Sequence, residues 1–203
     1  KGHARCNAFG LLHVKNNEKF DYLILMDGDG EDRPEELKSL IDKINEYPNN
    51  SVVAKRVKRS EGFFFQFLYK LHKLITFLFT GKNINFGNYS CLTKRDVGIL
   101  TDKASLWSSY SGTLKKNVAN LKEVESTRGL RYFGPSKMSL LQLLLHSFSI
   151  IAVFRYVVLF RALLLLIFLS FLDSYLGFFS YFLKIILAIF TICIFIVSIR
   201  ENK

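Results

Sequence analysis

The chain has 203 residues, 50% of them hydrophobic, and a formal net charge of +11. This length allows one domain of ordinary size plus an additional segment, and the apolar residues are concentrated in residues 138–199. A basic chain with an apolar end favours contact with anionic lipid headgroups. The basic residues are scattered and form no zinc-finger or RRM pattern, so we expect no nucleic-acid partner.

The three cysteines, Cys6, Cys91 and Cys193, are odd in number and widely spaced. This pattern predicts neither a disulfide framework nor a CxxC metal site, and it favours reduced thiols in a protein that faces the cytosol. The chain opens at Lys1, without a methionine or a signal-like segment, in what looks like a helix. We therefore expect that its natural N-terminal segment is missing.

The N-terminal part predicts a helix, a strand, a second helix and a second strand. Apolar residues at helical spacing predict the first helix over residues 3–14. The run Leu23–Met26 predicts a strand buried on both faces, Pro34–Glu46 a helix, and residues 51–56 another strand. The short links between them indicate a βαβ unit, so we expect the two strands to lie side by side and parallel.

The middle of the chain predicts a long helix followed by shorter elements. Residues 63–80 are rich in Phe and Leu but carry internal charges, which favours an amphipathic helix on the domain or at a membrane surface. A strand is expected over residues 87–92, and Thr93 is expected to cap the helix after it. The remaining expected elements are a short helix around Trp107, a strand over residues 120–125 and a basic, turn-rich loop over residues 127–137.

The C-terminal part predicts membrane attachment. Residues 138–155 are expected to form an interfacial helix, and residues 156–176 and 178–199 are each long enough to span a bilayer. Cationic residues flank the outer ends of both spans, whereas the turn between them carries only Asp173. The positive-inside rule therefore predicts an integral membrane protein with two spans, whose soluble domain and two termini are cytoplasmic. The predicted parts are residues 1–137, 138–155 and 156–203.

Two carboxylates follow the first predicted strand. Asp27 and Asp29 form a DxD motif at the C-terminal end of a strand, where open α/β sheets bind ligands. Carboxylates at this spacing can both reach a hard divalent cation. An EF-hand loop is excluded, because Asp32 stands where that loop needs glycine and Lys38 where it needs glutamate. An acidic turn that only supplies charge to the start of a helix is the alternative.

Several cations are candidates for binding an anionic substrate. Arg56 ends the second predicted strand, so its guanidinium is expected near the DxD motif, where it could bind a phosphate or pair with a carboxylate. Arg128, Arg131 and Lys137 lie among glycines directly before the interfacial helix, which suits an anionic group at the bilayer surface. The alternatives are an ordinary surface cation for Arg56 and positive-inside charge for the loop. The four histidines show no metal-ligand spacing.

The order of these motifs resembles a known enzyme family. The segments are DYLILMDGDGEDRPEEL, SVVAKR, GNYSCLTKR and RGLRYFGPSKMSLLQLLLHSFSIIAVF. They resemble the inverting family 2 glycosyltransferases with a GT-A fold, especially the branch that transfers sugars to dolichyl or polyprenyl phosphate. The resemblance implies an α/β fold, with a Rossmann-like, mostly parallel sheet followed by an interfacial helix and a two-helix transmembrane hairpin. It also implies a nucleotide-diphosphate sugar donor, Mg²⁺ or Mn²⁺ as cofactor, and a polyprenyl phosphate acceptor.

The resemblance also assigns roles to individual residues. Asp27 and Asp29 would bind the metal and the donor diphosphate, and Arg56 would lie on the donor side. Arg5 and Asn7 resemble the family's helix beside the donor. Asp29 and Arg128 would act in catalysis. The residues expected to bind the acceptor phosphate are Arg128, Arg131, Ser136 and Lys137.

The chain departs from the family pattern in two places. The family begins with a strand and a Pro-x-Tyr-Asn-Glu-like segment that holds the nucleobase, and both are absent here. Many members also carry an acidic residue where this chain has Asn88. A phosphate acceptor is already anionic, so it does not need a strong general base. The alternatives are transfer to a sugar hydroxyl and a non-catalytic, membrane-associated binding module of the same fold, and the chain could also form a homo-oligomer.

Overall fold

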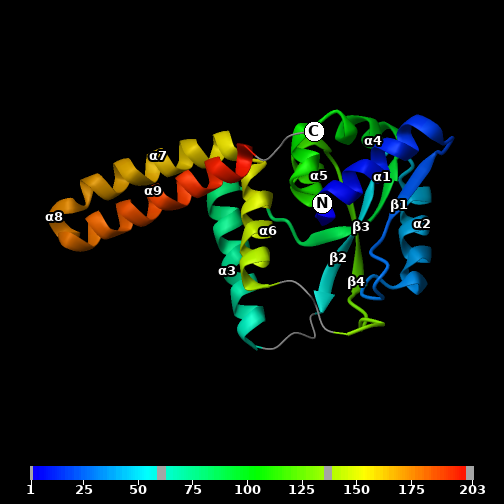
Figure 1. The fold of residues 1–203 in the computed structure, drawn as a ribbon, viewed down its shortest axis with the longest axis horizontal. Coiled ribbons are helices and arrows are strands. Elements are labelled where there is room, and N and C mark those ends of the chain that lie inside the picture. The colour runs from blue at the N-terminus through cyan, green and yellow to red at the C-terminus, as the bar shows by residue number, and fades with distance from the viewer. Residues whose placement is uncertain (1, 59–62, 135–138, 200–203) are drawn as a thin grey trace.

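The computed structural model describes residues 2–58, 63–134 and 139–199. Its N-terminal part is a four-stranded sheet with helices on both faces (Figure 1). The spatial order of the strands is β1-β3-β2-β4. Their bounds are Tyr22–Leu25 for β1, Val52–Lys58 for β2, Phe86–Thr93 for β3 and Lys122–Thr127 for β4.

The sheet is mixed. Strand β3 pairs antiparallel with both β1 and β2, whereas β2 pairs parallel with β4. Three strands therefore share one direction, as expected for a mostly parallel sheet. The reversed β3 nevertheless makes two of the three pairings antiparallel. The prediction that β1 and β2 lie side by side is wrong, because β3 returns after a long helix and enters between them. The short links on either side of the helix between β1 and β2 contain no signal for this non-local insertion.

Strand β1 forms one edge of the described sheet, which explains its exposure. The side chains of Leu23 and Leu25 pack against the core, whereas Tyr22 and Ile24 are 38% and 37% exposed. The prediction of a strand buried on both faces is wrong. An edge strand with one packed face is the observed arrangement, so its apolar run reflects β propensity as well as burial.

Helices cover the two faces of the sheet unequally. Helix α2 (Leu37–Glu46) follows a short 3₁₀ turn at Pro34–Glu36 and packs Leu40 and Ile44 on one face. Thr93 accepts a hydrogen bond from the Asp96 N–H (3.2 Å) at the start of α4, which confirms the predicted cap. Helix α5 was not predicted, since it has no apolar stripe. The helices on the second face are α1 (His3–Asn17), α4 (Lys94–Thr101), α5 (Tyr110–Asn117) and the 3₁₀ turn Ala104–Trp107.

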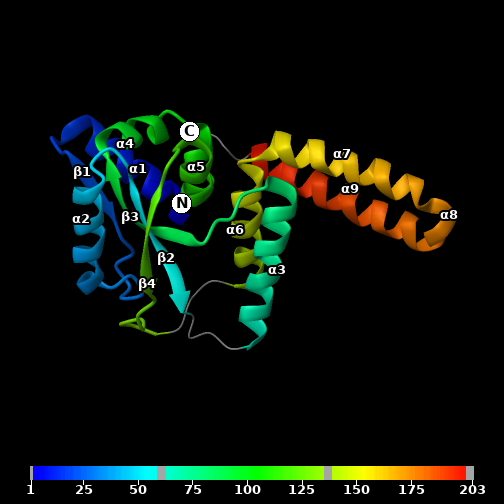
Figure 2. The ribbon, with the colours of Figure 1, turned by 180° about the vertical axis from the view of Figure 1, so that it is seen from behind.

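The C-terminal helices form a hairpin that projects away from the sheet (Figures 1 and 2). Helices α3 and α6 lie at its base, and α6 meets α7 at an angle of 91°. Within the described residues, α9 is the one helix long and apolar enough to cross a membrane alone, and α6 with α7 passes only as a bent pair. The bounds are Phe63–Thr80 for α3, Leu140–Ala152 for α6, Arg155–Phe171 for α7, Asp173–Leu176 for α8 and Phe178–Ile199 for α9.

Candidate active site

The DxD motif lies in a tightly held loop after β1. The backbone N–H of Asp27 donates to Asp32 Oδ2 (3.0 Å), and the N–H of Glu31 donates to Asp29 Oδ1 (3.1 Å). Gly30 has φ +90°, a left-handed conformation that a side chain would strain, so glycine is needed at this turn. The loop therefore presents Asp27 and Asp29 at the end of the strand in a fixed shape.

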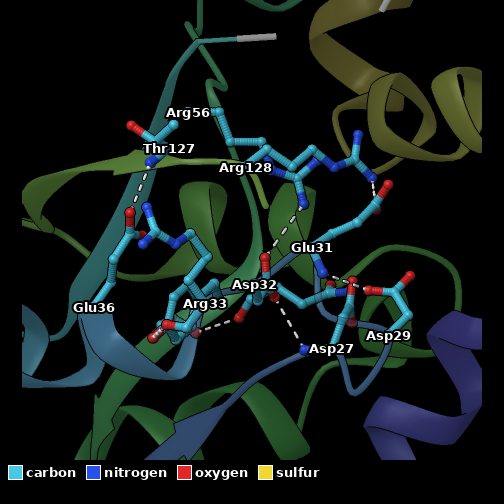
Figure 3. A network of polar contacts seen from close by, with 12 residues as sticks. Asp27, Asp29, Glu31, Asp32, Arg33, Glu36, Arg56, Thr127 and Arg128 are labelled. Carbon is cyan, nitrogen blue, oxygen red and sulfur yellow. Dashed lines mark hydrogen bonds and ion pairs between the residues drawn. The ribbon is translucent and has the colours of Figure 1, made fainter. Parts of the chain in front are cut away.

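Arg56 reaches this loop from β2, although β3 separates β2 from β1. Its Nη2 atom lies 3.8 Å from Asp32 Oδ1, and Figure 3 shows the guanidinium directed at that carboxylate. Gly87 of β3 makes this crossing possible, because a Cβ atom there would lie 2.6 Å from Arg56 Nη2. The expected proximity of Arg56 to the acidic loop is thus observed, with Asp32 rather than a DxD carboxylate as its close acidic partner.

The basic loop after β4 contacts the same acidic loop. Arg131 Nη1 lies 3.1 Å from Asp29 Oδ2, and Arg131 Nε donates to Glu31 Oε1 (2.9 Å). Arg128 forms an ion pair with Glu31 (Figure 3). The structure therefore brings the predicted acceptor-side Arg131 directly onto the predicted donor-side Asp29. Arg128 and Arg131 also share Glu31, to which the sequence patterns assigned no specific role.

Backbone contacts fix the two loops to each other. The N–H of Gly129 donates to Glu31 O (2.9 Å), and the N–H of Tyr132 donates to Asp29 O (2.9 Å). The Tyr132 ring covers Gly30, where a Cβ atom would lie 2.8 Å from it. Backbone hydrogen bonds and side-chain ion pairs thus both join the loop after β1 to the basic loop after β4.

Asp27 has two further partners that the sequence did not reveal. Its Oδ1 atom lies 3.1 Å from His3 Nε2 and accepts a hydrogen bond from Asn88 Nδ2 (3.1 Å). Burial acts to raise the pKa of Asp27, but the hydrogen bonds from His3 and Asn88, together with the charges of His3 and Arg56, give a net lowering of that pKa. The hydrogen bond to Asp27 raises the pKa of His3. Asn88, which replaces an acidic residue of the family pattern, therefore lies at the site as a donor to Asp27.

The His3–Asp27 contact predicts a measurable titration. We expect NMR to give His3 a pKa above 6.5 that falls in Asp27→Asn, because the carboxylate favours the imidazolium. The stability that this exposed pair contributes is present below pH 6.5 and lost as the pH rises through the folded pKa of His3. Asp102→Asn, which removes the partner of Lys15, is the control and should leave the His3 curve in place. An unchanged His3 curve in Asp27→Asn would contradict the contact.

The other predicted residues are placed less directly. Arg5 and Asn7 lie on α1, beside His3 in the sequence, and within the described residues no ion pair or hydrogen bond joins either side chain to Asp27 or Asp29. Ser136 and Lys137 lie outside the described residues. Their predicted roles therefore stay predictions.

Helix α6 lies close to the DxD loop. The charges of His3, Asp27 and Arg56 all act on His146 of α6, so the imidazole lies near this group. Sequence patterns predict no role for His146, because its neighbours at the site come from distant segments. The helix predicted to lie in the membrane interface is therefore also a neighbour of the candidate site.

The carboxylates suit a metal that arrives with a substrate. Within the described part of the chain, no three His, Cys, Asp or Glu side chains are grouped to hold a metal ion. Mg²⁺ commonly takes only one or two protein carboxylates and completes its shell with phosphate oxygens and water. Asp27 and Asp29 fit that donor set, and a diphosphate would supply the remaining oxygens.

Fold and site together define an α/β enzyme-like domain in which strand-end carboxylates face a loop of arginines. Comparison with known families agrees, since Glycosyl transferase family 2 matches residues 1–108, more than half of the chain. The chain belongs to this family and is a glycosyltransferase, and its mixed α/β architecture fits a GT-A fold. No curated protein matches the chain significantly.

Proposed function

We propose that the protein transfers a sugar, with inversion, from a nucleotide-diphosphate sugar to a polyprenyl phosphate at a membrane surface. The observation that carries this proposal is the contact between Arg131 and Asp29. It supports a site where a donor bound at the DxD motif and an anionic acceptor bound by the basic loop lie next to each other.

The donor side is assigned to the loop after β1. Asp27 and Asp29 would hold Mg²⁺ or Mn²⁺, which supplies positive charge to stabilise the leaving nucleoside diphosphate. The contacts of Asp27 Oδ1 with His3 and Asn88, and the hydrogen bond from the Glu31 N–H to Asp29, keep both carboxylates oriented before the donor binds. Such preorganisation is what makes electrostatic stabilisation effective.

The acceptor side is assigned to the basic loop. Arg128 and Arg131 present guanidinium groups that bind phosphate oxygens in a bidentate manner, and Ser136 and Lys137 are expected to add to this site. The acceptor phosphate oxygen would attack the anomeric carbon on the face opposite the leaving group. It is already ionised at neutral pH, so a site in which Asn88 replaces an acid is sufficient for this chemistry.

A lipid-borne acceptor agrees with the helices beside the site. Helix α9 has the length and composition of a membrane span, and we propose that α7 is its partner in a two-span hairpin with cytoplasmic ends. Arg161 of α7 donates to Leu78 O (2.7 Å) at the end of α3, and Lys184 lies 2.8 Å from Asp173 at the hairpin tip. These charges have partners, which lowers the cost of placing them near lipid.

The test is a transfer assay with the full chain in lipid nanodiscs. We expect radiolabel from a nucleotide-diphosphate hexose to appear in the organic phase only when Mg²⁺ or Mn²⁺ and a polyprenyl phosphate are present. Label on a water-soluble glycan would instead support a sugar hydroxyl as acceptor. No transfer, together with donor binding that does not depend on Mn²⁺, would support a non-catalytic binding module and contradict the proposal.

A further inference from the structure

Glu31 is the centre of a small ion-pair network that the assigned functions leave unexplained. It accepts hydrogen bonds from Arg131 Nε (2.9 Å) and Nη2 (3.2 Å), and it also pairs with Arg128. The Glu31 side chain is only 14% exposed, and those of Arg128 and Arg131 are 17% and 29% exposed. Ion pairs this shielded from water interact more strongly than surface pairs. We call the group Asp29, Glu31, Arg128 and Arg131 the clasp.

In the clasp, both oxygens of the Asp29 carboxylate of the DxD motif already have partners. Asp29 Oδ1 accepts the Glu31 N–H, and Asp29 Oδ2 lies 3.1 Å from Arg131 Nη1, so both carboxylate oxygens are engaged. A divalent cation bound at Oδ2 would lie beside a guanidinium of like charge, and this repulsion is substantial at contact distance. Cation binding at Asp29 therefore requires Arg131 to move away.

The clasp also occupies the arginines. Two guanidinium groups face two carboxylates, so the four formal charges cancel. A phosphate that approaches the closed clasp must compete with Glu31 for the same N–H donors. The arginines become strong phosphate ligands only when their carboxylate partners release them.

We propose that the clasp couples the binding of the two substrates, with Glu31 as the positioning residue, and this inference rests on the proposed function. A cation at Asp29 removes one of the two carboxylates that hold Arg131, and it thereby makes the guanidinium available to the acceptor phosphate. Glu31 holds Arg128 and Arg131 together in the closed clasp, and once the cation engages Asp29, a phosphate at Arg131 competes with Glu31 alone. Because binding linkage is reciprocal, acceptor phosphate strengthens cation binding by the same factor.

The experiment measures this linkage directly on the full chain in neutral nanodiscs. Mn²⁺ binding is followed by EPR, with and without a water-soluble short-chain isoprenyl monophosphate. In the unmodified protein we expect the monophosphate to tighten Mn²⁺ binding about tenfold, within the usual range of coupling between two sites. Arg131→Gln should bind Mn²⁺ about tenfold more tightly in the absence of the monophosphate, and its coupling should be lost.

Two further variants separate the clasp from a general structural effect. Glu31→Gln should bind the monophosphate about tenfold more tightly without metal, because it removes the carboxylate that Arg128 and Arg131 share and leaves Arg131 with Asp29 alone. A merely structural role of Glu31 would instead weaken binding. Arg95→Gln is the control for Arg131→Gln, because it removes the same positive charge at the far end of the sheet, where Arg95 pairs with Asp96. Its Mn²⁺ and monophosphate binding should match those of the unmodified protein.

The inference is overturned if the monophosphate leaves Mn²⁺ affinity unchanged, if coupling persists in Arg131→Gln, or if Glu31→Gln weakens phosphate binding. It is also overturned if no variant binds Mn²⁺. Lipid-linked product in the transfer assay reports on the proposed function separately. Sugar transfer without linkage would contradict the coupling role of the clasp and leave the proposed function in place. Linkage without sugar transfer would support the coupling and contradict the proposed function.

Discussion

Asp29→Ala should lower sugar transfer by about 1000-fold, because it removes one of the two carboxylates expected to hold the metal at the leaving diphosphate. The side chain of Asp29 is 36% exposed, and its close partners are Arg131 and the Glu31 N–H. The fold and membrane insertion should therefore persist. Initial rates with radiolabelled donor, together with carbonate extraction of membranes, measure the two properties.

A matched carboxylate makes this experiment specific. Asp42 is exposed on α2, away from the DxD loop, so Asp42→Ala changes the net charge equally and should retain normal turnover. Near-normal turnover by Asp29→Ala would contradict the role of the DxD motif. Equal losses in both variants would show that the assay responds to net charge rather than to the site.

Local signals in the sequence were sufficient for most element boundaries. The strand predicted from the run Leu23–Met26 is observed one residue earlier, at Tyr22–Leu25. The predicted helix start at Pro34 is a 3₁₀ turn that leads into α2. Thr93 caps its helix as expected. These features depend on residues a few positions apart, so a single chain carries enough information to place them.

The contacts that assemble the site depend on distant segments. Glu31 and Arg131 are 100 residues apart, and the His3–Asp27 contact joins α1 to the end of β1. No periodic pattern encodes which loop folds over which carboxylate, because this depends on how β3 and β4 order themselves in the sheet. The types of residue at the site could therefore be predicted from the sequence. The partners of these residues, and the roles of Glu31 and Asp32 in holding them, could not.

Asp32→Ala is expected to combine the largest loss of stability at the site with a loss of activity. Asp32 is 4% exposed, accepts the Asp27 N–H and lies 3.8 Å from Arg56. Alanine leaves the half-buried Asp27 N–H and the shielded Arg56 guanidinium without this carboxylate, at a cost of about 2–4 kcal/mol in the free energy of unfolding. The backbone of Asp27 loses its hydrogen bond to Asp32, so the Asp27 carboxylate can shift. A shift of about 1 Å in such a group lowers the reaction rate about 100-fold. Chemical denaturation and initial rates measure the two effects.

Asp32→Asn distinguishes the hydrogen bond from the charge. Burial, aided by the negative charge of Asp27, raises the pKa of Asp32 against the hydrogen bond from the Asp27 N–H and the charges of Arg56 and Arg128. Since the environment already disfavours the charged form, a neutral amide that keeps an acceptor oxygen for Asp27 should be tolerated far better than alanine. We therefore expect Asp32→Asn to retain most of both the stability and the transfer rate. Losses equal to those of Asp32→Ala would instead assign the role of Asp32 to its charge, as the counter-ion that holds Arg56 over β3.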